Sequence, residues 1–296
     1  MFYQFLTFIL AAIKKKITIT EDSKDKLSDQ TTFLEKHNID VKDFQKTKIK
    51  WSDLKVIFED YVKITDSLER AGKIIIDILF SNEARENGIH SVRYRIKSPK
   101  GLIEKIIKKK IREPKSNNIT VKNYREEITD LIGVRALHVF KQEWHIIDSF
   151  IKRKWNFKVG HEKVVVYCRD GDHKDYIDEC ENRGCTVKKH SKGYRSVHYI
   201  VKQEVNKEEI HCAEIQVRTI FEEGWSEIDH RIRYSLKNQS KHPLEEHLLI
   251  LNGIAGSADE FGKLIKRTHT DIEKGLYGNQ PTKAEKNIKK KGGGDA

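Results

Sequence analysis

The stretch that decides the fold covers residues 193–219 and has the sequence GYRSVHYIVKQEVNKEEIHCAEIQVRT. Residues 194–202 and residues 209–218 both have the β-branched and aromatic content of strands, and polar residues separate them. We predict that these two segments pair as a hairpin, which places a β-sheet at the centre of the fold.

Segments on both sides of this hairpin supply further strands and helices. Their types follow from the spacing of apolar residues, which recur at helical intervals or form short continuous runs. Helices are predicted over residues 50–80, 143–155, 173–182, 220–234 and 244–267, strands over residues 132–140 and 163–167, a loop or weak helix over residues 17–48, and a turn near residues 81–88. Together they predict an α/β (α+β) fold in which a mixed β-sheet is flanked by helices.

The pattern divides the chain into four parts. They are an N-terminal helical extension at residues 1–89, a mixed α/β core at residues 90–235, a C-terminal helical segment at residues 236–280 and a disordered basic tail at residues 281–296. The tail ends in KKKGGGDA and has too little apolar content to form a core.

The composition indicates a soluble, basic protein. The chain has 296 residues, of which 37% are apolar and 34% charged, and its net charge is +12. Such a charge suits a site for phosphates, either of nucleotides or of RNA, although a basic surface without any specific ligand explains it as well. We expect no DNA partner.

The four cysteines, Cys168, Cys180, Cys185 and Cys212, form no C-x-x-C pair. We interpret them as reduced, partly buried thiols of a cytoplasmic protein. A zinc site with the nearby His173 and His190 is a weaker alternative, because the spacings match no usual ligand pattern.

The first thirteen residues, MFYQFLTFILAAI, are apolar. They are shorter than the roughly 20 residues that span a bilayer, and they lack the basic region and cleavage site of a signal peptide. We therefore expect a core-packing or interfacial helix and no membrane partner.

A first candidate site lies around Arg95, Lys97, Gly101 and Lys105. Ser98 and Pro99 mark the start of a helix immediately after the first two of these cations. The free N–H groups and the dipole of a helix N-terminus attract phosphate. A solvated basic face is the alternative, since lysines continue at residues 108–110.

Two carboxylates are candidates for a metal site. Asp130 directly precedes the strand at residues 132–140 and is followed by Gly133 and Arg135. Glu214 alternates with Ile215 in the hairpin, so it faces away from the core and could serve as the second metal ligand or as a base. For Asp130 the alternative is a turn cap or a pair with Arg135.

The segment GYRSVHY at residues 193–199 offers a third site. In a strand, Tyr194, Ser196 and His198 share one face, which suits stacking on a base and contact with phosphate. Gly193 allows a backbone turn or a close approach to a ligand. An ordinary half-exposed strand is the alternative.

Five segments in fixed order resemble one known family. They are RIKSPKGLIEKI at residues 95–106, DLIGVR at residues 130–135, GYRSVHY at residues 193–199, EIQVRT at residues 214–219 and EIDH at residues 227–230. They are similar to the RelA/SpoT synthetase domain, which makes the alarmone (p)ppGpp, over about residues 90–235. The resemblance implies a nucleotidyltransferase-like fold. Because this sequence contains no HD pair of the family's hydrolase half, it also implies a stand-alone, small alarmone synthetase.

The resemblance also implies a role for each site residue. For the donor, Arg95 is expected against the adenine of ATP, and Lys97 and Lys105 on its phosphates, with Arg135 in support. Asp130 and Glu214 are expected to be catalytic and to bind Mg²⁺. For the acceptor, Tyr194 is expected to stack on the base and His198 to contact the phosphate. Two positions depart from the family pattern. Gly101 stands where a serine is expected, and His190 stands where a lysine is common, so Lys192 is assigned a compensating role at the acceptor.

The implied activity is an ATP- and Mg²⁺-dependent transfer of pyrophosphate to the 3′-hydroxyl of GDP or GTP. One alternative is a toxin-like relative that modifies the 3′ end of tRNA or an adenine nucleotide, with tRNA as a candidate partner because of the basic charge. The other is a non-catalytic nucleotide sensor. A homo-oligomer is expected from the family, and the flanking helices are candidates for regulation.

Overall fold

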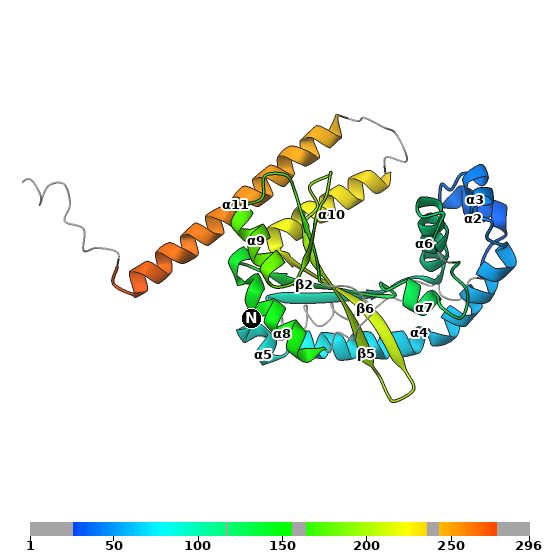
Figure 1. Ribbon diagram of the computed structural model, residues 1–296, viewed down its shortest axis with the longest axis horizontal. Helices are drawn as coiled ribbons and strands as arrows, with labels where there is room; N and C mark the ends of the chain where they lie inside the picture. Colours follow the sequence, from blue (N-terminus) through cyan, green and yellow to red (C-terminus); the bar gives the residue numbers. More distant parts are fainter. Residues whose placement is uncertain (1–25, 117, 156–163, 236–242, 277–296) are drawn as a thin grey trace, which may run out of the picture.

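The chain folds around one six-stranded mixed sheet, seen in the computed structural model, which describes residues 26–116, 118–155, 164–235 and 243–276 (Figure 1). The strands are β1 (Ser91–Ile96), β2 (Ile132–His138), β3 (Val165–Cys168), β4 (Thr186–Lys189), β5 (Ser196–Glu204) and β6 (Ile210–Thr219). Their order across the sheet is β1-β2-β6-β5-β3-β4. The predicted mixed α/β fold is confirmed, whereas the apolar N-terminal segment and the basic tail lie outside the described residues.

The sheet combines three antiparallel and two parallel strand pairs. β5 and β6 form the predicted antiparallel hairpin, and β6 then pairs in parallel with β2. β1 is antiparallel to β2, while β3 runs antiparallel to β5 and parallel to β4. The parallel β2–β6 pair joins segments that lie far apart in sequence, so it brings the DLIGVR and EIQVRT motifs side by side.

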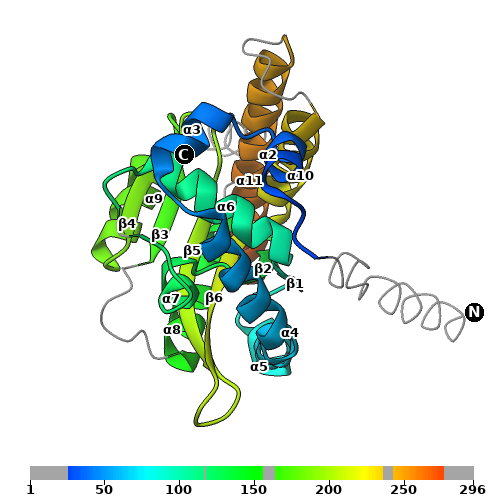
Figure 2. The same cartoon turned by 90° about the vertical axis from the view of Figure 1, so that its right-hand side faces the viewer.

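Helices flank the sheet (Figures 1 and 2). They are α2 (Gln30–Lys36), α3 (Val41–Thr47), α4 (Trp51–Leu79), α5 (Asn82–Glu86), α6 (Pro99–Arg112), α7 (Tyr124–Glu127), the short 3₁₀-helix η2 (Lys141–Glu143), α8 (Trp144–Lys154), α9 (Lys174–Asn182), α10 (Ile220–Ser235) and α11 (Leu244–Glu273). No helix in these described ranges combines the length and apolar character needed to cross a membrane.

The two faces of the sheet differ in chemistry because side chains alternate along each strand. On one face the residues of β2 and β6 are apolar and buried: Ile132, Val134, Ala136, Ala213, Ile215 and Val217. The long helix α4 lies along the sheet and contacts β1, β2, β5 and β6 (Figure 1). The opposite face carries the polar members of the same strands and is half-buried.

Local caps explain several helix boundaries. Ser98 accepts a hydrogen bond from the backbone N–H of Gly101 at 3.1 Å, as predicted for the start of α6. The turn expected near residues 81–88 is instead the short helix α5, because the Ser81 hydroxyl caps the N–H of Ala84 at 3.2 Å. The segment before Ser98, expected only to lead into a helix, is the edge strand β1.

The N-terminal helices α2 and α3 lie beside α6 in both views (Figures 1 and 2). His37, which follows α2, pairs with Glu104 of α6 across 2.9 Å between Nδ1 and Oε2. Together with α4, these helices support the segment at residues 95–106, which carries the first candidate site. The four cysteines are buried, free thiols, as predicted.

Candidate functional site

The register of the sheet places the predicted site residues in rows across its polar face. In one row, Arg95 of β1 lies opposite Gly133 of β2, which lies opposite Glu214 of β6. In the next row, Arg135 of β2 is followed by Gln216 of β6, which lies opposite His198 of β5. Motifs as far apart in sequence as those of Arg95 and Glu214 therefore meet on one surface.

Gly133 leaves space for the Arg95 side chain. A Cβ atom at Gly133 would lie 3.7 Å from both Cγ and Nε of Arg95, so the arginine side chain lies over this position at the distance of an ordinary contact with such a Cβ. Arg95 is exposed. Its planar guanidinium is therefore available to stack on a ligand ring.

Asp130 binds the two lysines of the first motif. Its Oδ2 atom lies 3.0 Å from Nζ of Lys97 and 2.7 Å from Nζ of Lys105. Its Oδ1 atom is buried and has no hydrogen-bond partner in the described structure. The predicted turn cap or pair with Arg135 is thus replaced by a lysine–carboxylate cluster with one free carboxylate oxygen.

The backbone around Lys97 is held by two hydrogen bonds. The N–H of Lys97 donates to the carbonyl of Leu131 at 2.9 Å, and the hydroxyl of Tyr61 on α4 donates to the carbonyl of Lys97 at 2.7 Å. Burial lowers the pKa of the Lys97 ammonium, an effect that the charge of Asp130 partly opposes. Lys97 is consequently a positioned, partly desolvated cation.

Gly101 takes part in the cap that starts α6. A Cβ atom at this position would lie 2.9 Å from the Ser98 hydroxyl oxygen, which is closer than real contacts allow. The glycine that departs from the family pattern therefore favours the cap geometry, and a serine there would require the Ser98 side chain to move.

Glu214 is held by two neighbours on the same face. Nδ1 of His198 lies 3.1 Å from its Oε1 atom, and Nε2 of Gln216 donates to its Oε2 atom at 2.5 Å. Burial alone would raise the pKa of Glu214, but these partners and the charge of Lys105 outweigh it and lower the pKa to about 2. Glu214 is thus ionised across the physiological pH range.

Four rings gather where β5 meets β3. The hydroxyl of Tyr194 lies 2.9 Å from Nε2 of His198, and Tyr167 of β3 lies within ring contact of both, with centroid distances of 5.6 Å to Tyr194 and 4.8 Å to His198. The His190 ring lies 5.4 Å from that of Tyr194. An imidazole thus stands at the position where the family commonly has a lysine.

Arg218 completes this cluster. Its guanidinium carbon lies 4.8 Å from the centroid of the Tyr194 ring, and its Nη2 group bonds to the Tyr194 hydroxyl. Arg218 also donates from Nε to the Ser196 hydroxyl at 3.1 Å. Arg218 therefore fixes the position of the Tyr194 side chain, whose ring is half-buried.

Sequence reasoning missed Tyr167 and Arg218. The EIQVRT motif contained a signal for Arg218: it lies two and four residues after Gln216 and Glu214, so in a strand all three share one face of β6. No comparable signal existed for Tyr167, since only the register of β3 against β5 shows which face it occupies.

Arg135 contacts carboxylates of α10. Its Nη1 atom lies 2.8 Å from Oε1 of Glu223 and also bonds to Glu227 of the EIDH motif. Arg93 of β1 pairs with the same two glutamates. The arginine predicted to support the donor phosphates thus lies one row beyond the Arg95–Gly133–Glu214 row, farther from the lysine cluster, and it pairs with α10.

Lys192 is exposed in the turn that precedes Gly193. Its backbone N–H approaches Nδ1 of His190 at 3.4 Å. Of the predicted acceptor residues, Tyr194 and His198 are in direct contact, whereas Lys192 lies at the outer edge of their cluster.

The donor set suits a cation that needs few protein ligands. Among the described residues, no three His, Cys, Asp or Glu side chains come together as a metal cluster. Mg²⁺ commonly takes one or two protein carboxylates and completes its shell with phosphate oxygens and water. Asp130 with its unpartnered Oδ1 and the ionised Glu214 fit that requirement.

Part of the chain matches a known protein family, and most of it is similar to a known enzyme. Residues 94–239 match the family described as "Region found in RelA / SpoT proteins". GTP pyrophosphokinase YwaC of Bacillus subtilis (strain 168) is 29% identical over 218 residues, which cover 70% of this chain and 91% of that protein.

Two solved structures are similar at lower levels. A GTP pyrophosphokinase family protein from Streptococcus pneumoniae is 20% identical, with a TM-score of 0.48 and coverage of 79% of this chain and 100% of the other. Small alarmone synthetase 2 from Bacillus subtilis is 27% identical, with a TM-score of 0.45 and coverage of 73% and 99%.

Proposed function

Because residues 94–239 match the region found in RelA/SpoT proteins and the chain is similar to a GTP pyrophosphokinase, we propose that it is a RelA/SpoT-type transferase that moves the β,γ-pyrophosphoryl group of ATP to the 3′-hydroxyl of GDP or GTP. The observation that carries the proposal is the polar face of the sheet. There the lysine–carboxylate cluster around Asp130 and the ring cluster around Tyr194 lie on either side of Glu214.

The donor nucleotide is assigned to the β1–β2–α6 side. Lys97 and Lys105 supply two positive charges close together, which neutralise a polyphosphate. Arg95 is exposed over Gly133, so its guanidinium can stack on the adenine. Arg135 pairs with Glu223 of α10 and so supports this side indirectly, through the position of that helix.

Asp130 and Glu214 are the residues that would hold Mg²⁺. When bound, the cation would neutralise phosphate charge, which phosphoryl transfer requires. The proposal is supported by the free Oδ1 atom of Asp130 and by the low pKa of Glu214, because a metal ligand must stay ionised.

The acceptor nucleotide is assigned to the β5–β3 side. Tyr194 offers a ring for stacking on the base, and Tyr167 and His190 border it. His198 lies between that ring and Glu214 and is placed to contact acceptor phosphate. The acceptor 3′-hydroxyl would then approach the donor phosphates from the Glu214 side.

In the proposed reaction the 3′ oxygen forms a bond to the β-phosphorus of ATP, and the bond from that phosphorus to the α,β-bridging oxygen breaks. AMP leaves with the bridging oxygen. With a pKa of about 2, Glu214 is a poor proton acceptor, so its proposed role is chiefly to hold charge near the reacting atoms. The hydroxyl proton passes to solvent or to a product phosphate oxygen.

The test is transfer of label from ATP labelled at the β- and γ-phosphates. The purified protein would be offered GDP, GTP, ADP, ATP and deacylated tRNA side by side, with Mg²⁺. We expect label on GDP or GTP, and a loss of at least about a hundredfold in Glu214→Gln and Asp130→Asn, in line with removal of an electrostatic group from an active site.

Glu208→Gln is the matched control, because Glu208 is exposed in the loop between β5 and β6, away from the polar face. Label on tRNA alone would favour the toxin-like relative, which the net charge of +12 and the lysines at residues 105–115 support. Full activity in Glu214→Gln and Asp130→Asn would reject the proposed metal site. Since ATP and guanine nucleotides are cytoplasmic metabolites, we place the activity in the cytoplasm.

A further inference from the structure

We propose that α11 is a positioning element for the acceptor side, and that Asn252 is the positioning residue which holds Gly193 and thereby sets where Tyr194 presents its ring. The inference rests on the proposed function. It concerns the C-terminal segment, to which the sequence assigned no chemistry.

Asn252 is 1% exposed and uses both ends of its side-chain amide. Its Nδ2 atom donates to the carbonyl of Gly193 at 2.7 Å, and its Oδ1 atom accepts from Nη1 of Arg169 at 3.2 Å. Burial of an amide is unfavourable unless its donors and acceptors are paired. The two contacts therefore account for an asparagine in the middle of a buried helix face.

The approach of Asn252 also explains the glycine at position 193. Gly193 has a φ of +77°, and a Cβ atom on it would lie 3.0 Å from both Cγ and Oδ1 of Asn252. Sequence reasoning left open a backbone turn or a ligand approach. The structure has the turn, and the group that approaches is the side chain of α11.

A second contact lies on the other side of Tyr194. Arg195 is buried and binds Asp172, with Nε 2.9 Å from Oδ1. Its guanidinium lies against Gly256, one helical turn after Asn252. A Cβ atom on Gly256 would lie 2.7 Å from Nη2 of Arg195. The residues before and after Tyr194 are thus both held against α11.

A third contact reaches the strand beneath the ring. Asp259 of α11 accepts a hydrogen bond from the hydroxyl of Thr219 at 3.0 Å. Thr219 directly follows Arg218, which bonds to the Tyr194 hydroxyl. All three α11 contacts therefore end on segments that hold Tyr194.

These contacts make up nearly the whole buried stripe of α11. Within its described length, the buried residues are Leu248, Asn252, Gly256 and Asp259, which recur at helical spacing on one face. Leu248 alone among them is a large apolar residue. The orientation of α11 is consequently set by polar contacts of defined geometry rather than by general apolar burial.

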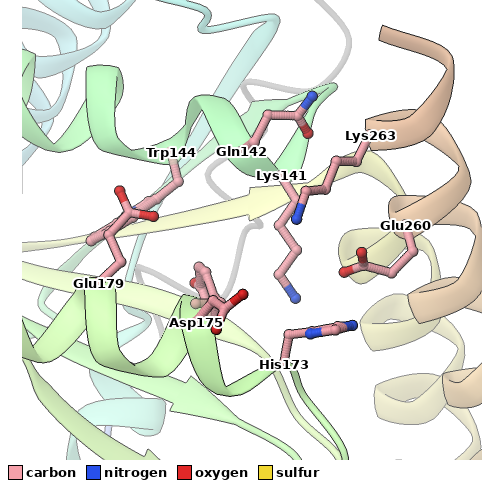
Figure 3. Close-up of a pocket in the computed structure, with 9 residues that line it drawn as sticks. Lys141, Gln142, Trp144, His173, Asp175, Glu179, Glu260 and Lys263 are labelled. Atoms are coloured by element: carbon pink, nitrogen blue, oxygen red, sulfur yellow. The ribbon is translucent and has the colours of Figure 1, made fainter. Parts of the chain in front are cut away.

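Elsewhere α11 contacts α10 and η2, and a cavity lies beside it. A cavity of about 100 Å³ separates α11 from η2 and α9, and Figure 3 shows Glu260 and Lys263 of α11 across from Lys141 and His173. A shift of α11 would therefore disrupt the contacts of Asn252, Gly256 and Asp259, together with the hydrogen bond from Trp225 of α10 to the Leu248 carbonyl and the ion pair between Lys266 and Glu143.

The experiment compares steady-state kinetics and backbone hydrogen exchange in variants of the full chain. Asn252→Ala removes both amide contacts, while Asn252→Asp keeps an acceptor for Arg169 but cannot donate to Gly193. We expect both to raise KM for GDP about tenfold and to leave KM for ATP within about twofold, since a lost buried hydrogen bond has effects of this order. Amide exchange across residues 190–196 should accelerate in both.

Two matched controls lie on the same helix. Ser257→Ala removes a hydroxyl that bonds only to the helix backbone at Gly253, and Gly253→Ala adds a Cβ at an ordinary contact distance of 3.7 Å from Arg169. Both should behave as the unmodified chain does. Gly256→Ala, by contrast, should reproduce the Asn252→Ala phenotype because it displaces Arg195.

The outcomes separate this inference from the proposed function. If the unmodified chain labels GDP or GTP but Asn252→Ala changes neither KM for GDP nor exchange at residues 190–196, the inference is wrong and the function stands. An equal rise in both KM values would also overturn it, because that result indicates a general structural role. If the unmodified chain labels no guanine nucleotide, the proposed function fails, and the exchange comparison alone reports whether Asn252 holds the loop.

Discussion

The helices α4 and α11 have almost the same length, 29 and 30 residues, but they bury opposite kinds of side chain. α4 lies along the apolar face of the sheet and buries large aliphatic and aromatic residues, among them Leu54, Ile57, Tyr61, Leu68 and Ile75. α11 buries one leucine and otherwise Asn252, Gly256 and Asp259. The first arrangement supplies stability, because apolar burial is non-directional, and the second supplies position, because hydrogen bonds fix geometry.

The apolar residues of α11 are found mainly on its other side. Ile254 is 60% exposed and Ile265 is 65% exposed, with Leu249, Ile250, Phe261, Leu264 and Ile272 also exposed. Since a helix of a globular protein usually turns its apolar stripe to the core, α11 departs from the rule that α4 follows. A homo-oligomer in which another copy covers this surface would explain why these apolar residues face outward, and it stays a proposal.

The largest expected effect comes from an attack on the α4 interface. Leu68 is 0% exposed, so Leu68→Ala should lower the free energy of unfolding by about 2–5 kcal/mol through lost burial and a cavity. Urea denaturation followed by tryptophan fluorescence measures this. Val62→Ala on the exposed side of α4 is the control. A loss below 1 kcal/mol for Leu68→Ala would contradict the stabilising role of this helix.

The second effect concerns Asp259 and depends on pH. Burial and the neighbouring carboxylate of Glu222 raise the pKa of Asp259 to about 7, while the hydroxyl of Thr219 and the charges of Lys141 and Arg195 oppose the rise. A carboxyl whose pKa is raised by folding favours the folded state below its unfolded pKa, near 4. This stability is lost as the pH rises through the folded value.

Asp259→Asn keeps a hydrogen-bond acceptor for Thr219 and removes the titration. We therefore expect it to stabilise the protein by about 2 kcal/mol at pH 8, and by less at pH 5, where Asp259 in the folded state is already protonated. Thermal unfolding at both pH values measures the difference. An equal change in Tm at pH 5 and pH 8 would show that burial of this charge is not the cause.

Sequence patterns predicted helix α4 and the face of the sheet that carries Glu214, but not which side of α11 packs against the core. For α4 the apolar spacing gave the helix and its buried side together, and in the hairpin the alternation of Glu214 with Ile215 gave the polar face. For α11 the same rule would turn the wrong side inward, because its buried residues are polar or small. The partner of Asn252 lies 59 residues away along the chain, and no local pattern encodes such a contact.

The donor side was predictable only in part for a similar reason. Ser98 and Pro99 identified the start of α6, and the lysines next to it indicated phosphate. That Lys97 and Lys105 share one oxygen of Asp130 depends on the antiparallel β1–β2 pair, and the edge strand β1 was not predicted. Long-range pairing, rather than residue type, decides which charges meet.

A third, smaller effect tests whether α4 also has a positioning contact. Its Tyr61 donates to the carbonyl of Lys97, which parallels the bond from Asn252 to Gly193 on the other side of the site. Tyr61→Phe keeps the buried ring and removes only the hydroxyl, so stability should fall by about 1 kcal/mol. KM for ATP should rise about threefold while KM for GDP stays unchanged, the reverse of the Asn252→Ala result. A rise in KM for GDP instead would contradict the assignment of donor and acceptor sides.

The smallest effect is expected on the exposed side of α11. Leu249 is 56% exposed, so Leu249→Ser should change the free energy of unfolding by no more than about 0.5 kcal/mol in a monomer. Sedimentation or light scattering over a range of protein concentrations decides what a larger change would mean. If Leu249→Ser lowers both the apparent mass and the stability in a concentration-dependent way, a second copy of the chain covers this face. In that case α11 would have both kinds of interface: polar contacts toward its own core, and apolar contacts, like those of α4, toward the other copy.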